Sequence, residues 1–218
     1  MIDLHTHSIL SDGALLPAEL ARRAYVKGYR VLGISDHVDY SNVDFVVPRL
    51  VEACESGTNY DGLEVMPGAE VTHVPPKGIT RLVERARELG ARFVIVHGET
   101  LAEPVAPGTN RAGVEARADI LAHPGLISEE DAELAARLGV LLEITAKPGH
   151  CLTNGYVAKV AKEVGARLSF GTDSHLPEDL RSRKEAESIL LGAGLSEEEV
   201  HEVFRNLEEL YCTLKTGR

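Results

Sequence analysis

The chain has 218 residues, of which 44% are hydrophobic and 26% charged, and its formal net charge is −11 at pH 7. This length and composition are typical of one globular domain with a sizeable core. The negative charge argues against a general nucleic-acid binder, which normally carries a basic face. The cysteines Cys54, Cys151 and Cys212 are too few and too widely spaced for a disulfide framework or a CxxC zinc site.

The N-terminal sequence MIDLHTHS has no basic region followed by an apolar stretch, so no signal peptide is expected. No apolar run approaches the roughly 20 residues that a membrane span requires. Together with three cysteines that suit reduced thiols, these features predict a cytoplasmic protein that does not bind a membrane.

Short apolar runs alternate with helix-like segments from the start of the chain. The runs have the length of strands, and their hydrophobicity is continuous rather than alternating, which indicates strands buried on both faces, as in a parallel sheet. Seven strands are expected, at residues 1–4, 31–35, 63–68, 92–96, 119–122, 140–145 and 167–171.

Helices are predicted between these strands, and the stretch from 99 to 117 is expected to be a long loop with at most a short helix. The expected helices are 17–27, a weaker segment after Val46, 80–89, one from Ser128 to Gly139, 154–164, and terminal helices at 180–191 and 196–210. Repeated strand–helix units predict a (βα) barrel or a doubly wound sheet within a single domain, residues 1–218, whose terminal helices begin at about residue 179.

Histidines and acids recur where the predicted strands end. Six of the nine histidines follow strands in this way. The polar residues at these positions are His5, His7, Asp36, His37, Glu70, His97, His123, Asp173 and His175. In (βα) barrels this rim carries the active site, built from residues distant in sequence. A single histidine there is more often structural, and His201 is expected to be so, but repetition at six strand ends favours a metal centre.

The residue types also suit a metal. In an extended segment His5 and His7 point to the same side, so both imidazoles can approach one ion. Asp12, Glu70 and Asp173 supply carboxylates, and a carboxylate can bridge two ions. Mixed imidazole and carboxylate ligands favour zinc, manganese or iron over calcium.

These residues lie in motifs that resemble the polymerase and histidinol phosphatase (PHP) family. The matching segments are Asp3-Leu4-His5-Thr6-His7-Ser8, Ser11-Asp12-Gly13, Ser35-Asp36-His37, Gly68-Ala69-Glu70, Val96-His97-Gly98, Ala122-His123-Pro124 and Gly171-Thr172-Asp173-Ser174-His175. They occur in the family's order from Met1 to about Leu176. The resemblance implies a distorted (βα)7 TIM-like barrel that holds two to three divalent transition-metal ions.

The resemblance also implies three ligand sets. The first is His5, His7, Glu70 and Asp173; the second is Glu70, His97 and His123, with Glu70 bridging; the third is Asp12, His37 and His175. Some family members have a histidine at the position of Asp12. Glu70, Asp173 and His175 are then the expected catalytic residues. Asp3 and Asp36 are expected to orient neighbouring imidazoles or loops, although Asp36 would equally suit a cap on a strand-end turn.

Three further residues are candidates for substrate binding. Arg111 lies on the long loop after the fourth strand, where its guanidinium could clamp a phosphate. Lys147 and His150 follow the sixth strand and should face the same rim. For each of the three residues, the alternative to substrate binding is an ordinary solvated surface position. The loop 99–113 is expected to be either a lid over the site or disordered.

The sequence therefore predicts a metal-dependent phosphoesterase in which a metal-bound hydroxide attacks a small phosphomonoester, with histidinol phosphate as one candidate. No Gly-x-Ser-x-Gly nucleophile motif is present. The alternatives are a nucleotide phosphodiesterase or exonuclease, an amidohydrolase, and a metal-binding regulatory module without catalysis. The acidic chain disfavours long nucleic acids as substrates, and a small phosphorylated metabolite is the expected partner.

Overall fold

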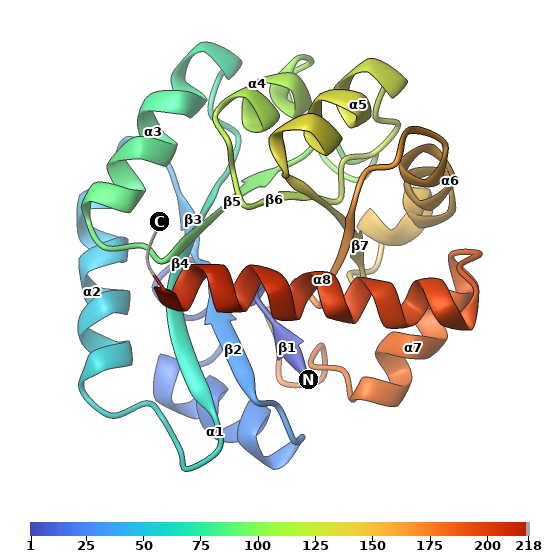
Figure 1. The fold of residues 1–218 in the computed structure, drawn as a ribbon. Coiled ribbons are helices and arrows are strands. Elements are labelled where there is room, and N and C mark those ends of the chain that lie inside the picture. Colours follow the sequence, from blue (N-terminus) through green and yellow to red (C-terminus); the bar gives the residue numbers. More distant parts are fainter. Residues whose placement is uncertain (217–218) are drawn as a thin grey trace.

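Eight parallel strands form one sheet that curls into an almost closed barrel (Figure 1) in the computed structural model, which describes residues 1–216. The strands are β1 (Ile2–Asp3), β2 (Val31–Ile34), β3 (His37–Val38), β4 (Glu64–Val71), β5 (Phe93–His97), β6 (Ile120–Ala122), β7 (Leu141–Thr145) and β8 (Leu168–Gly171). Their order is β1-β2-β4-β5-β6-β7-β8, and β3 also pairs with β4. This order confirms the predicted TIM-like α/β barrel and excludes the doubly wound sheet.

The second predicted strand, 31–35, is present as β2, and a further short strand that was not predicted, β3, follows it at His37. The carboxylate of Asp36, between β2 and β3, accepts hydrogen bonds from the backbone N–H and hydroxyl of Ser8. Asp36 therefore ties the end of β2 to the loop that follows β1.

The barrel closes between β8 and β1, where a single bridge joins Thr6 and Ser174. The backbone N–H of His7 donates to the carbonyl of Ser174 at 2.8 Å. Below this bridge the Thr172 hydroxyl donates to the Asp3 carboxylate at 2.6 Å. The closure holds the ends of β1 and β8 together, and both ends carry predicted ligands.

Helices surround the barrel on its outer face (Figure 1). They are α1 (Pro17–Val26), α2 (Val43–Glu55), α3 (Pro76–Glu88), α4 (Thr109–Glu115), α5 (Glu129–Leu138), α6 (Asn154–Val164), α7 (Arg183–Gly192) and α8 (Glu197–Thr216), with a 3-10 turn, η1, at His150–Thr153. As expected, Ser128 caps α5 by accepting from the N–H of Asp131, and the helix ends at Gly139 with φ 74°. Within residues 1–216, none of the helices combines the length and apolar character needed to cross a bilayer.

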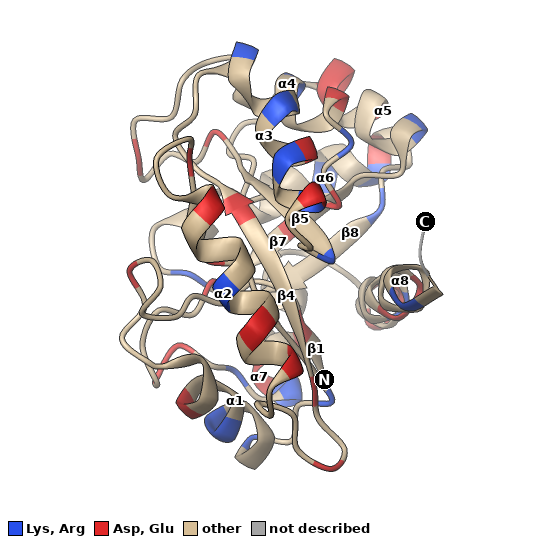
Figure 2. Ribbon diagram, turned by 90° about the vertical axis from the view of Figure 1, so that its left-hand side faces the viewer, with Lys and Arg blue, Asp and Glu red and all other residues tan. Residues whose placement is uncertain are grey.

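Helix α8 crosses the end of the barrel at which the strands begin (Figure 2). The Asn206 side chain donates to the carbonyl of Leu168 at the start of β8. The Tyr211 hydroxyl donates to Glu64 at the start of β4, and Leu207 is fully buried. Because α8 covers this end, the opposite end of the strands remains for a site.

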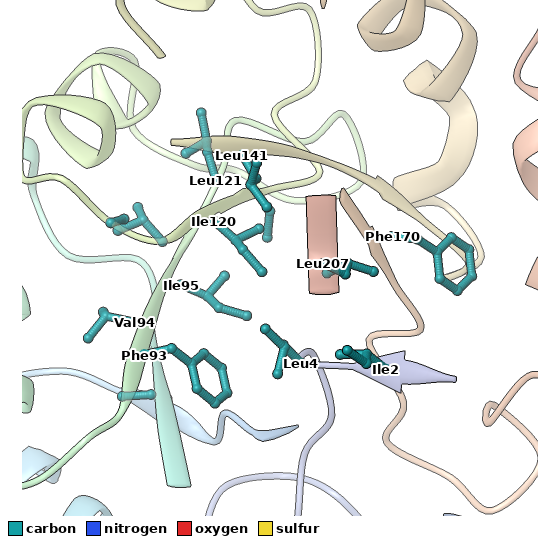
Figure 3. Packing of buried hydrophobic residues seen from close by; sticks show 14 of the residues in the cluster. Ile2, Leu4, Phe93, Val94, Ile95, Ile120, Leu121, Leu141, Phe170 and Leu207 are labelled. Atoms are coloured by element: carbon teal, nitrogen blue, oxygen red, sulfur yellow. The ribbon is translucent and has the colours of Figure 1, made fainter. Parts of the chain in front are cut away.

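Apolar side chains fill the barrel below that opposite end (Figure 3). The ring of Phe93 lies against two glycines: a β-carbon placed on Gly68 would lie 2.3 Å from its Cζ, and one on Gly33 would lie 2.6 Å away. Phe93 itself is fully buried. Glycine is therefore required at both positions by the close approach of the ring.

Replacement of Gly68 by alanine should lower the free energy of unfolding by about 1–3 kcal/mol, because the buried Phe93 ring has to move to make room. Urea denaturation followed by circular dichroism measures the change. Gly192→Ala is the control, since an added β-carbon there meets no atom within 4 Å. Equal midpoints for wild type and Gly68→Ala would show that the Phe93 ring can shift without cost.

Candidate metal centre

The nine side chains predicted as metal ligands come together at the carboxyl ends of the strands. They form overlapping groups whose ligand atoms lie within 4.8 Å of one another. The groups are His5, His7 and Glu70; His5, His123 and Asp173; His97, His123 and His150; His7, Asp12, His37 and His175; and His73, His97 and Glu103, so that His73, Glu103 and His150 join the nine predicted residues. The strand ends thus assemble one continuous cluster from residues up to 170 positions apart in the sequence (His5 to His175).

Glu70, at the end of β4, is the carboxylate at the centre of this cluster. Its Oε2 lies 3.3 Å from Nε2 of His5, 3.4 Å from Nε2 of His7 and 2.9 Å from Nδ1 of His37. Its Oε1 lies on the side of His123, 3.9 Å from that residue's Nε2. The two oxygens therefore face different histidines, as a carboxylate between two cations would.

Asp173, after β8, lies beside the same imidazoles. Its Oδ1 is 3.3 Å from Nε2 of His7 and 3.8 Å from Nε2 of His5. Its Oδ2 is 3.7 Å from Nε2 of His123. Both carboxylates are buried, so the two acids and three imidazoles form a centre that is largely closed to solvent.

Asp12 lies at the more open side of the cluster. Its Oδ1 is 3.2 Å from Nε2 of His175 and 3.6 Å from Nε2 of His37. The side chain of Asp12 is 57% exposed, against 16% for His175. The set of Asp12, His37 and His175 is thus the part of the cluster that a molecule arriving from solvent meets first.

Many ligand-type atoms of the centre are buried without a hydrogen bond. Among the described residues they include both carboxylate oxygens of Glu70, Oδ1 of Asp173, and Nε2 of His5, His7 and His123. Buried polar atoms normally have hydrogen-bond partners, and an unpaired one costs about 1–3 kcal/mol. Unpaired imidazole nitrogens and carboxylate oxygens that face one another are the donor set of a transition-metal ion, so the residues fit such an ion.

The protonation states also suit a cation. Burial lowers the pKa of His7 to about 3, and burial also lowers the pKa of His123 well below its usual value. Burial acts to raise the pKa of Glu70, but His5 and His37 outweigh it and hold that pKa well below its usual range. His7 and His123 are therefore neutral imidazoles and Glu70 is an ionised carboxylate, the forms that coordinate metals.

Two of the cluster residues have a strained backbone. His123 has φ 27° and Asp173 has φ 50°, in the region that favours glycine. A non-glycine residue there costs about 1–3 kcal/mol, and such strain collects at functional sites where the surrounding structure enforces it. The fold thus holds these two side chains toward the cluster at the expense of local stability.

Asp3 and Asp36 have positioning contacts of different kinds. Asp3 accepts from the backbone N–H of His5 at 3.1 Å, as well as from Thr172. Asp36 accepts from Ser8 and from the Ser11 hydroxyl, both at 2.6 Å, and so shapes the turn between His7 and Asp12. Both acids contact loop backbone and hydroxyl groups near the ligands.

Glu143, in the middle of β7, was not among the predicted site residues. Its Oε1 lies 2.7 Å from Nδ1 of His5, and the side chain is 1% exposed. Burial lowers the pKa of His5, but Glu143 and Glu70 outweigh it and raise that pKa well above its usual value. A lone acid in an otherwise apolar strand was the signal, because such a group is rarely buried without a partner.

The three predicted substrate contacts lie in different surroundings. Nζ of Lys147 is 2.7 Å from Nδ1 of His175 and 4.0 Å from Oδ1 of Asp173, so this lysine reaches the cluster. His150 lies within the cluster itself, beside His97 and His123. Arg111, by contrast, is on α4 and pairs with Asp131 on α5 at 2.5 Å. That pairing gives no support to a phosphate clamp, which stays a prediction.

Glu103, on the loop between β5 and α4, is a second residue of the cluster that was not predicted. Its Oε2 lies 2.9 Å from Nε2 of His73 and 3.3 Å from Nε2 of His97. Its Oε1 lies 3.5 Å from Nε2 of His150. An acid among ordinary loop residues carries no periodic signal, so only the folded loop reveals this contact.

Solved structures share the fold at low sequence identity. A chain of archaeal ribonuclease P, determined with mature tRNA, superposes with a TM-score of 0.72 over 96% of this chain and 89% of that one, at 19% identity. A candidate histidinol phosphatase from Listeria monocytogenes gives 0.61 over 85% and 99%, at 11% identity. These similarities concern the fold alone.

Similarities in sequence extend over most of the chain, although no family model matches it. A protein named probable phosphatase TTE1963, from Caldanaerobacter subterraneus subsp. tengcongensis, is 28% identical over 91% of this chain and 85% of its own. A 5'-3' exoribonuclease of Haemophilus influenzae is 32% identical over 54% of this chain and 45% of its own.

The uncharacterized protein MJ1295 of Methanocaldococcus jannaschii is 46% identical over 200 residues, which cover 91% of this chain and 92% of that protein. At this identity over nearly the full length of both chains, the protein belongs to the same family as MJ1295.

Proposed function

We propose that the protein is a metal-dependent phosphoesterase of the PHP type that hydrolyses a small phosphomonoester, with histidinol phosphate as a candidate substrate. The observation that carries the proposal is the convergence of nine imidazole and carboxylate side chains, Glu70 at their centre, with ligand atoms of His5, His7, Glu70, His123 and Asp173 buried and unpaired. The name probable phosphatase, carried by a relative similar over 91% of this chain, supports the same class of reaction.

Three groups of residues would hold the ions, which we propose to be two or three zinc, manganese or iron ions. His5, His7 and Asp173 would bind the first ion and His97 and His123 the second, with Glu70 between them. Asp12, His37 and His175 would bind the third. Bound ions of this kind lower the pKa of a coordinated water to about 7 and neutralise phosphate charge.

The chain's own residues would orient the substrate at this centre. Lys147 places an ammonium group beside His175 and Asp173, where it can donate to a phosphate oxygen at the rim. Asp12 and His175 lie at the open side, so a phosphate would enter past them. Glu70 and Asp173, both ionised, would stay fixed in the buried centre during the reaction, and no side chain has to act as a covalent nucleophile.

The rim composition favours a small substrate. Among the described residues, the loops that follow the strands carry Lys147 and Arg181 as their basic side chains, beside several acids. A long nucleic acid needs several phosphate contacts from lysine and arginine, which supply most of its affinity. Partial similarity to an exoribonuclease keeps nucleotide hydrolysis as the second candidate, in which case short or single nucleotides would be the substrates.

Removal of metal should abolish hydrolysis. After dialysis against EDTA, we expect the rate on phosphomonoesters to fall by at least about a hundredfold, and Mn²⁺, Zn²⁺ or Fe²⁺ to restore it. The assay is a screen of phosphomonoesters, including histidinol phosphate, beside nucleotide diesters and single-stranded oligonucleotides. Turnover of diesters without monoesters would replace the first candidate by the second. Stoichiometric metal with no turnover of any ester would favour a regulatory module.

Replacement of Lys147 by methionine should raise KM for the phosphomonoester about tenfold, because a charge-assisted hydrogen bond to the phosphate is lost, with a smaller change in kcat. Steady-state kinetics on the metal-loaded enzyme measures both constants. Lys159→Met, on the exposed face of α6, is the matched control. If KM is unchanged in Lys147→Met, the lysine belongs to the surface and not to the substrate site.

A further inference from the structure

The loop between β5 and α4 is closed at its base by one side chain. Oε1 of Glu99 accepts hydrogen bonds from the backbone N–H groups of Gly108 and Asn110, both at 2.9 Å. The Asn110 side chain in turn accepts from the N–H of Glu99 and donates to the carbonyl of Pro124. The segment 99–108 therefore projects from a fixed base, and Glu103 lies on the projecting part.

Glu103 is the residue by which this loop reaches the cluster. Its carboxylate lies among three imidazoles from three different segments: His73 after β4, His97 at the end of β5, and His150 after β7. His73 has φ 53°, so its backbone is strained at the point where its ring meets Glu103. A glutamate carboxylate is ionised near neutral pH, so Glu103 brings a negative charge to these three rings.

His150 has the orientation of a metal ligand. Its Nδ1 is hydrogen-bonded to the Thr100 hydroxyl at 2.8 Å, which leaves Nε2 to face the cluster. His5 and His97 show the same division, with Nδ1 held by Glu143 or by the carbonyl of Gly98 and Nε2 toward the centre. Metal-bound histidines usually have the second ring nitrogen fixed in this way.

The position of His150 matches that orientation. The ligand nitrogens of His150, His97 and His123 lie within 4.8 Å of one another, and all three residues are buried. The ring of His150 lies 4.3 Å from that of His123 and 5.7 Å from that of His97, measured between centroids. Three buried imidazoles and one ionised carboxylate form a donor set for one ion of the zinc, manganese or iron type.

We propose that His150 and Glu103 are further ligands of the ion between His97 and His123, so that this ion fastens the loop 99–108 onto the site. This inference rests on the metal occupancy assumed in the proposed function. It changes the role of His150 from a substrate contact to a ligand. It also gives the loop two states. Glu103 is bound to the ion when the ion is present, and the loop can move away from the cluster when the ion is removed. His73 shares a group of ligand atoms within 4.8 Å with His97 and Glu103, but its side chain is 44% exposed, and we assign it the positioning of Glu103.

Metal binding tests the proposal without reference to activity. In the full-length protein loaded with Mn²⁺ or Co²⁺, ions per chain are counted by elemental analysis, and their affinities are measured by competition with a chelator. Glu103→Gln and His150→Gln should each weaken one ion by about tenfold or more and leave the others unchanged. Glu115→Gln and His201→Gln, exposed on α4 and α8, are matched controls and should bind as wild type does.

Hydrogen exchange tests the loop. Addition of metal should slow exchange of the amides of residues 99–108 in the wild type and in both controls, but not in Glu103→Gln. Wild-type affinities in both variants, or equal metal protection of the loop in Glu103→Gln, would overturn the proposal. Glu103 is partly exposed, so its replacement tests the idea even if His150→Gln fails to fold.

The test of the two ligands can be distinguished from the test of the proposed phosphoesterase activity. Selective loss of one ion in a protein that hydrolyses no phosphoester would support the ligands and refute the activity. Phosphomonoester hydrolysis with unaltered metal binding in both variants would refute the ligands and leave the activity standing.

Discussion

Replacement of Glu70 by glutamine is expected to lower phosphoesterase kcat by about a thousandfold or more and to release at least one metal ion, with the fold retained. The size follows from the loss of several kcal/mol of charge stabilisation when an ion is lost or displaced. Glu70 is the carboxylate whose two oxygens face His5, His7 and His37 on one side and His123 on the other. An amide keeps the shape of the side chain but removes its charge and one acceptor oxygen.

The measurements for Glu70→Gln are metal content, steady-state kinetics and thermal unfolding. Glu64→Gln is the matched control, because Glu64 lies on the same strand at the opposite end of the barrel, where Lys215 and Tyr211 contact it. Glu64→Gln should retain full metal content and activity. A fully metal-loaded Glu70→Gln protein with wild-type kcat would remove Glu70 from the bridging position.

Replacement of Glu143 by alanine is expected to weaken metal binding at the His5 position by about 10–100-fold. The carboxylate of Glu143 is buried against Nδ1 of His5 at 2.7 Å, and it fixes both the ring orientation and the tautomer that presents Nε2 to the ion. Without this carboxylate, the imidazole of His5 can rotate. It also lacks the neighbouring negative charge that increases the basicity of its ring.

Glu143→Gln should have a smaller effect than Glu143→Ala, because the amide oxygen can still accept from the imidazole. Chelator competition measures the affinities, and circular dichroism checks that the barrel is retained. If the alanine variant binds every ion as tightly as the wild type, Glu143 is a buried acid without influence on the centre.

The strands were predictable because each is a short apolar run whose two faces are buried. Only local details differ: β4 continues to Val71, beyond the predicted end at 68, because it pairs with β3 on one side and β5 on the other. Helix α3 begins at Pro76 instead of residue 80, since proline at the first helical position is favourable. Helix α2 contains Pro48, which explains why its pattern is weak.

The histidines and acids at strand ends were predictable as a group for a different reason. In a parallel barrel every carboxyl end meets the same rim, so a repeated placement along the chain becomes proximity in space. His5, Glu70 and His123 thus converge from strands far apart in sequence.

The sequence by itself determined the alternation of strands and helices, the resemblance to a metal-dependent family, and the nine side chains that converge. Only the tertiary structure decided which other side chains contact these nine residues. Glu143 supports His5 across the barrel, Glu103 reaches the cluster from a loop, and Arg111 pairs with Asp131 on α5. The reason is physical: strand periodicity fixes which end a residue occupies, whereas side-chain contacts depend on loop paths and rotamers that no periodic pattern encodes.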